Sequence, residues 1–374
     1  MAACAPAPRL RADLSEALDR LVPPILDRDH VPGAVIAIGD ADGVRVERVY
    51  GLARVVPTPA LMTVDTLFDL ASLTKVVGTA TAIMALEEDG RLSLDDPVSR
   101  SIPGFAAPDK APIVLRDLLT HASGLPAYIT GPEMVARYGP GPQPTAVVAA
   151  IAAAPLLYPI RSGYTYSCLN YISAARVAER AAGEPLDAYL RQRIYRPLGM
   201  NETGFGPPPE AAGRCAATEV IDGAPLQGVV HDPLAQYYGC AAGPSGNAGL
   251  FATARDLARY ARMILRDGEL DGIRVLRRET VERMTRPQSV PGLKPRAIGW
   301  DLYETPPWQP RPVSTSEPRA IGHTGYTGTF LWIDRASGVF VVLLTNRVHP
   351  DDSGKVEPLR KAVLEATTEF SRLK

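Results

Sequence analysis

The ten residues Thr66-Leu-Phe-Asp-Leu-Ala-Ser-Leu-Thr-Lys75 lead from a loop into an apolar stretch that predicts a helix over Ser72–Asp89. Ser72 and Lys75 are three positions apart, so they share one face at the start of that helix. The backbone N–H groups of the first turn have no intrahelical partners and surround the serine with donors. A lysine desolvated here can lose its proton and accept one from the serine. The same pattern also fits a capping serine followed by a surface lysine.

Two further segments supply the remaining parts of an acyl-transfer site. Tyr166-Ser-Cys-Leu-Asn-Tyr171 lies just before a predicted helix, in a loop that can face the serine. Gly322-His-Thr-Gly-Tyr-Thr-Gly328 opens a hairpin near the C-terminus, where a strand edge offers backbone N–H and C=O groups. In chain order, the three segments provide a nucleophile with its lysine, a proton shuttle and an oxyanion-binding backbone.

The two ends of the chain predict one antiparallel sheet. Gly33–Gly39 and Val44–Tyr50 flank a turn and form one hairpin, and Gly328–Asp334 with Val339–Thr345 form another. A helix is expected outside each hairpin, over Leu10–Arg28 and Val356–Phe370. The fold class is therefore α/β (α+β), with a sheet built from both chain ends and flanked by helices.

The middle of the chain predicts mainly helices separated by Pro/Gly loops. The expected helices are Leu115–His121, Pro144–Ala154, Asn170–Ala182, Leu186–Tyr195 and Ala254–Leu265. We therefore expect residues 1–80 and 250–374 to form a discontinuous α/β region and residues 81–249 an inserted, mainly helical region. The active site is expected between the two.

Composition excludes several function classes. The 374 residues include 40 basic and 41 acidic side chains, and a net charge of -1 argues against nucleic-acid binding by the whole chain. Hydrophobic and charged contents of 46% and 22% are typical of an ordinary soluble globular protein. No apolar stretch reaches the ~20 residues that span a membrane. There are only six lysines against 34 arginines, which makes Lys75 conspicuous.

Common cofactor and metal signatures are absent from the sequence. It contains no HExxH, no GxxxxGK[ST] and no GxSxG pattern. The cysteines Cys4, Cys168, Cys215 and Cys240 show no CxxC spacing, so we expect no metal site, no redox pair and no cofactor, and unpaired thiols instead. Ala2-Ala3-Cys4 is similar to the end of a lipoprotein cleavage box. A removed leader would indicate the periplasm or the cell surface, and otherwise the cytoplasm, so the compartment stays open.

From Val31 to Pro350 the chain resembles the serine hydrolases of the class C β-lactamase and penicillin-binding-protein superfamily, which includes esterases, D-aminopeptidases and muropeptide amidases. The segments that carry this resemblance, besides Thr66–Lys75, are Pro32-Gly-Ala, Leu118-Leu-Thr-His-Ala-Ser-Gly-Leu125, Val230-His-Asp232, Gly246-Asn-Ala-Gly-Leu-Phe-Ala-Thr253 and Leu344-Thr-Asn-Arg-Val-His-Pro350. The last three resemble the amidase and esterase branch more than the antibiotic-destroying β-lactamases. The resemblance implies a β-lactamase/transpeptidase-like fold.

The resemblance also implies roles for single residues. Ser72 becomes the acylated nucleophile, Lys75 its activating base and Tyr166 the second proton-transfer group. The backbone N–H groups of Ser72 and Tyr326 become the oxyanion hole. The residues expected to contact the substrate are His323, Thr324, Gly325, Cys168, Asn170, Asn346 and Arg347.

The sequence departs from the family pattern at two positions. Cys168 stands where the tyrosine motif usually has Asn, so either Asn170 substitutes from the next turn or the contact to a substrate amide is missing. A Cys168 nucleophile is the less favoured alternative, because thiols at an apolar helix start are usually structural. His323 stands where the strand triplet commonly has Lys, and imidazole is mostly neutral at pH 7. Arg347 is the residue that could restore a cation for a substrate carboxylate.

The remaining histidines are expected to support the architecture. His121 lies in a tight turn, and His231 with Asp232 is expected in loop structure or at the cleft rim. The sequence favours a serine hydrolase that acts on a small ester, amide or peptide. A penicillin-binding or sensor protein that acylates without turnover and an acyltransferase stay open as alternatives. The substrate and the oligomeric state are not indicated by any pattern.

Overall fold

The computed structural model describes residues 7–239, 244–288, 293, 295–303 and 320–371. Cys4, Cys240, Lys294 and the proline-rich segment Thr305–Pro318, which the sequence offers as part of the pocket wall, lie outside the described residues. No helix in the described ranges has the length and apolar character needed to cross a membrane.

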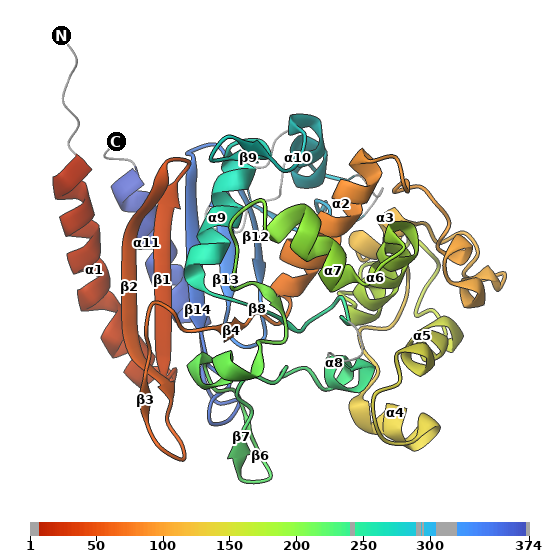
Figure 1. Ribbon diagram of the computed structural model, residues 1–374, viewed down its shortest axis with the longest axis horizontal. Helices are drawn as coiled ribbons and strands as arrows, with labels where there is room; N and C mark the ends of the chain where they lie inside the picture. The colour runs from red at the N-terminus through yellow and green to blue at the C-terminus, as the bar shows by residue number, and fades with distance from the viewer. Residues whose placement is uncertain (1–6, 240–243, 289–292, 294, 304–319, 372–374) are drawn as a thin grey trace.

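A seven-stranded antiparallel sheet forms one side of the molecule and combines strands from both ends of the chain (Figure 1). The pairing of β1 with β14 joins the two ends, with Ala34 opposite Thr345. This confirms the sheet that the two hairpins predict. In spatial order the strands are β11 (Asp301–Tyr303), β12 (Ala320–Thr324), β13 (Phe330–Asp334), β14 (Val339–Thr345), β1 (Gly33–Asp40), β2 (Gly43–Arg54) and β3 (Ala60–Leu61).

Helices cover both faces of this sheet because its central strands are apolar on both sides. Along β1, Ile36 faces α1 (Ala7–Arg28) and α11 (Glu357–Ser371), whereas Val35 belongs to the core on the opposite face. There α9 (Ala254–Leu265) packs against β1 and β14. Alternate residues of a strand point to opposite faces, so a continuous apolar run fits a strand buried on both sides.

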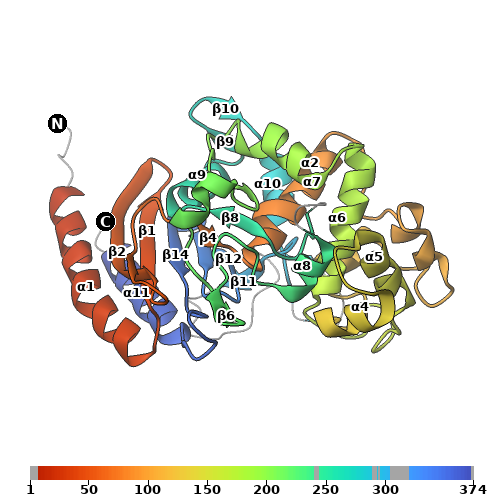
Figure 2. The ribbon, with the colours of Figure 1, turned by 60° about the horizontal axis from the view of Figure 1, so that its bottom comes forward.

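The middle of the chain folds into a cluster of helices beside the sheet (Figure 2). A π-helical segment, Thr74–Ala80, continues directly into the helix α2. The helices in chain order are α2 (Thr81–Glu88), α3 (Leu115–Leu119), α4 (Gly131–Tyr138), α5 (Pro144–Ala153), α6 (Cys168–Ala182), α7 (Leu186–Leu190), α8 (Pro233–Tyr238) and, after α9, α10 (Arg278–Thr285).

A small three-stranded sheet connects the nucleophile segment to a distant part of the chain. In it β8 (Leu250–Ala252) lies between β4 (Phe68–Asp69) and β5 (Gly204–Phe205). The segment before Ser72 is thereby held beside the Gly246–Thr253 segment. Two short ribbons complete the strands, β6 (Val220–Ile221) with β7 (Ala224–Pro225) and β9 (Glu269–Leu270) with β10 (Ile273–Arg274).

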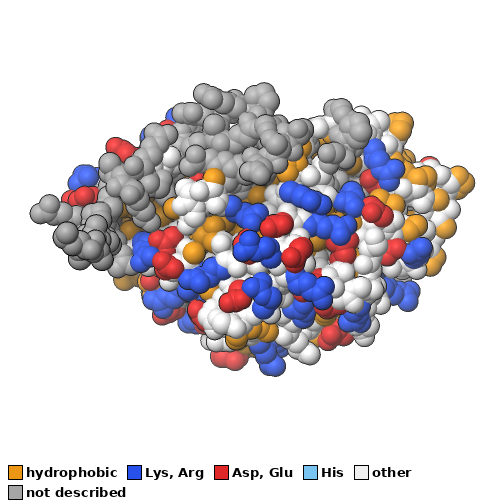
Figure 3. Space-filling model, turned by 90° about the horizontal axis from the view of Figure 1, so that it is seen from above, with side chains coloured by type: hydrophobic (Ala, Val, Ile, Leu, Met, Phe, Trp, Pro, Cys, Tyr) orange, Lys and Arg blue, Asp and Glu red, His pale blue; other side chains and the backbone are white. Residues whose placement is uncertain are grey.

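The surface visible in Figure 3 carries basic and acidic side chains in alternation. Ion pairs such as Arg266 with Asp42 and Arg278 with Asp267 show how the arginines are balanced locally. A surface of this kind does not produce the one-signed field that attracts a phosphate backbone. It agrees with the near-zero net charge.

Candidate active site

Ser72 lies at a sharp turn between β4 and the helix that follows. Ala71 has a left-handed backbone (φ +46°), which is rare for a residue with a side chain and is typical of functional turns. Its N–H donates to the Asp69 carboxylate at 2.8 Å. Ser72 is half-buried, and within the described residues its backbone N–H has no hydrogen-bond partner. The turn therefore presents both the hydroxyl and the N–H of Ser72.

Lys75 is completely buried and hydrogen-bonds to the serine. Its Nζ lies 2.9 Å from Ser72 Oγ and 2.9 Å from the carbonyl oxygen of Asn247. Burial acts to lower the pKa of Lys75, but its interactions with Cys168 and Tyr166 act to raise it, and the net pKa lies above its ordinary value. Desolvation therefore does not by itself set the pKa of Lys75 in the folded chain.

Tyr166 is half-buried and lies next to Lys75 and two histidines. The Lys75 Nζ is 5.1 Å from the centre of its ring. The rings of His121 and His323 have their centres 4.6 Å and 5.9 Å from that of Tyr166. The tyrosine, which comes from the helical part of the chain, therefore meets residues of the Ser72 helix and of β12.

Both histidines beside Tyr166 are buried and neutral at pH 7. Burial lowers the pKa of His323 to about 4, and the charges of Arg296 and Lys75 act in the same direction. Burial also lowers the pKa of His121 well below its usual range. His323 Nδ1 hydrogen-bonds to the Thr324 carbonyl at 2.8 Å, and the Ser167 N–H donates to His121 Nδ1 at 3.0 Å. The position where family members carry Lys is thus uncharged.

The turn between β12 and β13 is attached to the nucleophile segment by two buried threonines. Thr327 Oγ1 donates to the Asp69 carbonyl at 2.8 Å, and Thr329 Oγ1 donates to the Leu70 carbonyl at 2.9 Å. A Cβ at Gly325 would lie 2.5 Å from the Leu70 carbonyl oxygen, so only glycine allows this approach. These contacts bring Gly325 and Tyr326 beside the Ser72 turn.

The N–H of Tyr326 is available for a ligand. Among the described residues it has no hydrogen-bond partner, and the Tyr326 side chain is 54% exposed. With the Ser72 N–H it gives two free backbone donors on adjoining segments. Two donors of this kind are what a tetrahedral acyl-transfer intermediate requires.

The other predicted contact residues divide into two groups. Cys168 is half-buried, is unpaired and acts on Lys75 electrostatically, so it belongs to the site. Asn170 is buried, and its Oδ1 accepts from Ser123 Oγ at 2.6 Å, which gives it a structural task. Asn346 Nδ2 donates to the Leu52 and Ala53 carbonyls and connects β14 to β2. The predicted substrate contacts of these two asparagines have no support in this geometry.

Arg347 is also engaged within the protein. Its Nη1 lies 2.7 Å from Asp352 Oδ1, and its Nε donates to the Tyr326 carbonyl at 2.6 Å. The guanidinium is thus already paired and is not a free cation for a substrate carboxylate. Thr324 is half-buried and uses its carbonyl to hold His323.

Two residues of the site were not given a role from the sequence. Asn247 supplies the carbonyl that holds Lys75, and the buried Asp69 carboxylate binds the N–H groups of Ala71 and His231. Both residues lie in segments that carry the family resemblance. That resemblance is the feature of the sequence that could have indicated them. His231 and Asp232 behave as architecture, as expected: His231 contacts Glu219 at 2.8 Å and Asp232 caps α8.

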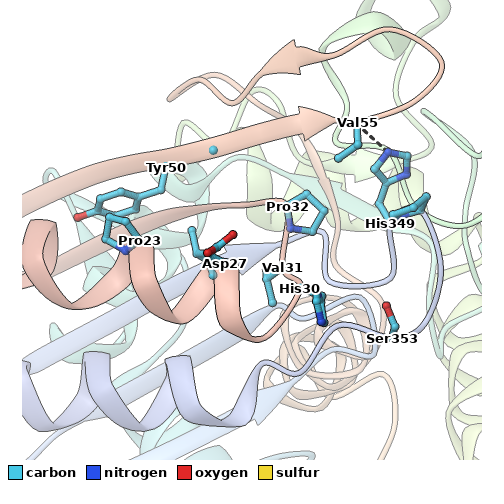
Figure 4. A pocket seen from close by; sticks show the side chains of 12 residues that line it. Pro23, Asp27, His30, Val31, Pro32, Tyr50, Val55, His349 and Ser353 are labelled. Atoms are coloured by element: carbon cyan, nitrogen blue, oxygen red, sulfur yellow. Dashed lines mark hydrogen bonds between the residues drawn. The ribbon is translucent and has the colours of Figure 1, made fainter.

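A separate cavity of about 630 Å³ lies beside the C-terminal end of α1 (Figure 4). Its labelled lining residues include Asp27, His30, Tyr50 and Ser353, and His349 in its wall accepts from the Val55 N–H at 2.8 Å. Ser72, Lys75 and Tyr166 do not line this cavity. No group of three or more His, Cys, Asp or Glu side chains in the described ranges is arranged to hold a metal ion.

Comparisons with known proteins identify the family of this chain. A model of the Beta-lactamase family matches residues 18–366. The N-acetylmuramyl-L-alanine amidase of Bacillus subtilis (strain 168) is 31% identical over 366 residues, covering 88% of this chain and 81% of the amidase.

Solved structures show the same fold. EstCE1, a hydrolase with promiscuous acyltransferase activity, superimposes with a TM-score of 0.77 at 22% identity, covering 96% of this chain and 99% of EstCE1. The D-alanine carboxypeptidase AmpC from Burkholderia cenocepacia has a TM-score of 0.73 at 20% identity, covering 96% of this chain and 99% of that chain. The chain therefore belongs to the beta-lactamase family and is a serine hydrolase of that family.

Proposed function

We propose that Ser72 attacks the carbonyl carbon of an ester or amide and carries the acyl group as a covalent intermediate. The observation that supports this most strongly is the fully buried Lys75, whose Nζ bridges Ser72 Oγ and the Asn247 carbonyl at 2.9 Å each. Burying an ammonium group against neutral oxygen atoms, without a carboxylate partner, costs folding free energy. Such a costly arrangement is typical of a functional site. Here it lowers the energy of the serine alkoxide.

The proton of Ser72 passes to the Lys75–Tyr166 pair during attack. Lys75 Nζ lies 5.1 Å from the centre of the Tyr166 ring, and the pair acts as the base in the form in which one of the two groups has lost its proton. When the C–O or C–N bond of the tetrahedral intermediate breaks, Tyr166 gives a proton to the leaving alcohol or amine. Water then attacks the acyl carbon and gives a proton to the pair, which passes it to Ser72 Oγ as the bond between the acyl carbon and that oxygen breaks.

The negative charge on the carbonyl oxygen is received by the backbone N–H groups of Ser72 and Tyr326. Neither N–H is used by another described residue. One such donor contributes about 3 kcal/mol to lowering the barrier of acyl transfer. No cofactor is needed for these steps.

The substrate is proposed to bind between the α/β region, residues 1–80 and 250–374, and the helical region, residues 81–249. Ser72 and Tyr326 come from the first region and Tyr166 from the second. Tyr164 and Tyr326 are 41% and 54% exposed near these groups and offer aromatic surface for an apolar acyl chain.

We expect short-chain esters to be preferred and β-lactams to be turned over slowly or not at all. His323 is neutral and Arg347 is paired with Asp352, so neither described residue offers a free cation for the carboxylate of a β-lactam. The similarity to an amidase supports an amide as a second substrate class.

The test is one panel of nitrophenyl esters, a chromogenic cephalosporin, D-aminoacyl amides and muropeptides, with wild type and Ser72→Ala. The wild type should hydrolyse the short esters, and Ser72→Ala should lose all activity. Intact-mass measurement should show one acyl adduct on the wild type alone. Full activity of Ser72→Ala on every substrate turned over would refute the proposal.

A further inference from the structure

The peptide groups around the Tyr326 N–H are bound from behind by two arginines. Arg347 Nε donates to the Tyr326 carbonyl at 2.6 Å. Arg360 Nη2 lies 3.4 Å from the Gly325 carbonyl and 3.3 Å from the Thr329 carbonyl. The Gly325 carbonyl belongs to the same peptide group as the Tyr326 N–H, so a cation on its oxygen acts directly on that donor.

Arg347 is fixed in place by several contacts. Its Nη1 binds Asp352 Oδ1 at 2.7 Å and the Gly354 carbonyl at 3.1 Å. The guanidinium carbon lies 4.6 Å from the centre of the Tyr326 ring, within the range of a cation–π contact. The Tyr326 hydroxyl donates to the other oxygen of Asp352. Arg347, Asp352 and Tyr326 therefore form a closed ring of contacts around the turn.

Arg360 reaches the turn from α11, and the carboxylate that opposes its positive charge is not in close contact with it. Its side chain is 16% exposed, and the Glu357 carboxylate is 3.9 Å away. Its Nε has no hydrogen-bond partner in the described part of the chain. Burial lowers the pKa of Arg360 to about 10, which leaves it protonated at neutral pH. Its main hydrogen-bonded contacts are the two turn carbonyls.

A cation bound to a peptide carbonyl withdraws electron density from the amide and makes its N–H a stronger donor. Positive charge behind the donor also stabilises an oxyanion in front of it, in a region with little water. We propose that Arg347 and Arg360 are positioning residues for the Tyr326 N–H as an oxyanion donor: Arg347 fixes the turn through the Tyr326 carbonyl, and Arg360 also polarises the N–H through the Gly325 carbonyl. This rests on the proposed acylation of Ser72.

The inference gives Arg347 a different task from a contact with a substrate carboxylate. A substrate contact raises KM when it is lost, and mainly for anionic substrates. A polarised oxyanion donor acts in the transition state, so its loss lowers kcat for neutral esters and leaves KM nearly unchanged. Kinetics with an uncharged substrate therefore distinguish a contact with the substrate carboxylate from a contribution to the oxyanion donor.

The test compares Arg360→Met, Arg360→Gln, Arg360→Lys and Arg347→Met with wild type on a neutral nitrophenyl ester. We expect the two Met variants to lose about tenfold in kcat with KM within about twofold, less than the 10²–10³ that loss of an oxyanion donor itself costs. A phenylboronic acid, which forms a tetrahedral adduct on serine, should bind these variants more weakly by the same factor. Arg360→Lys should recover most of the loss.

Arg48→Met is the matched control, because Arg48 pairs with Asp19 on α1 and does not touch the turn. Arg360→Gln keeps a hydrogen-bond donor but removes the positive charge. It therefore tests the effect of the charge on kcat even if Arg360→Met fails to fold. Wild-type kcat and boronate affinity in Arg360→Gln and Arg347→Met would overturn the inference while leaving the Ser72 chemistry intact. If Ser72→Ala remained active, the proposed function would fail instead.

Discussion

Replacing Thr329 by Val removes one hydroxyl that attaches the oxyanion turn to the nucleophile segment. Valine has the same shape, so the change isolates the 2.9 Å bond from Thr329 Oγ1 to the Leu70 carbonyl. The bond is fully buried and contributes about 1 kcal/mol to stability. For a chain of this size that loss lowers Tm by about 2 °C. The Leu70 carbonyl keeps a second donor, the Leu73 N–H, at 3.0 Å.

The effect on catalysis should exceed the effect on stability. The bond sets the distance between the turn that carries the Tyr326 N–H and the turn that carries Ser72. A displacement of about 1 Å between catalytic groups costs about 100-fold in rate. We therefore expect kcat for a short nitrophenyl ester to fall between about 10- and 100-fold in Thr329→Val. Thr327→Val, which loses the 2.8 Å bond to the Asp69 carbonyl, should behave alike.

Thr367→Val is the control for both variants. Thr367 is also buried, and its Oγ1 donates to the Val363 carbonyl at 2.7 Å within α11, away from the turn. Thermal unfolding and ester kinetics should show similar Tm losses in all three variants and a kcat loss in Thr327→Val and Thr329→Val alone. Equal kcat in Thr329→Val and Thr367→Val would refute the geometric argument.

Three further results are expected. Because the folded pKa of His323 is depressed to about 4, the unfolded chain binds its proton first as pH falls from about 6.5, and stability drops through that window by up to about 3 kcal/mol. Urea unfolding at pH 7 and pH 4.5 should show a smaller drop for His323→Gln. Cys168→Ala should keep at least about a third of wild-type ester turnover, whereas Cys168→Asn should raise amide turnover relative to ester turnover. Methanol added to the ester assay should divert part of the acyl group to the methyl ester if the acyl-enzyme is open to solvent acceptors.

Each result has an outcome that contradicts it. An equal pH-dependent loss in His323→Gln would show that other groups set the acid stability. Loss of ester turnover by more than about 100-fold in Cys168→Ala would support a thiol nucleophile. A product ratio unaffected by methanol would exclude acyl transfer to alcohols.

The sequence predicts the sheet and the catalytic segments because both depend on local patterns. Each hairpin consists of two apolar runs around a short turn, which is a local pattern, whereas the pairing of Ala34 with Thr345 between the hairpins is seen only in the folded chain. The Ser72–Lys75 spacing places both side chains together, as observed at 2.9 Å. The helix begins as a π-helical segment, Thr74–Ala80, which no spacing pattern indicates.

The helix α4 is not among the helices that the sequence predicts, because it lies in a Pro/Gly-rich stretch. Its capping box was nevertheless visible: Thr130 accepts from the Glu133 N–H, and Glu133 returns a bond to Thr130. The sequence predicts Arg347 at the substrate because His323 stands where the family commonly has Lys, and only the folded chain shows that Arg347 pairs with Asp352. The pKa of Lys75 depends on Cys168 and Tyr166, which are distant in sequence, so its direction could not be derived from burial alone.

The strand pairing of β1 with β14 has a consequence for how the proposed site is assembled. The nucleophile lies in the first fifth of the chain, whereas the turn with the Tyr326 N–H, and both arginines behind it, lie in the last fifth. A chain in which that turn has not yet packed holds the serine, its lysine and the Ser72 N–H but lacks the second proposed oxyanion donor. Closing the sheet through the pairing of β1 with β14 therefore also brings together the two segments that carry the proposed oxyanion donors.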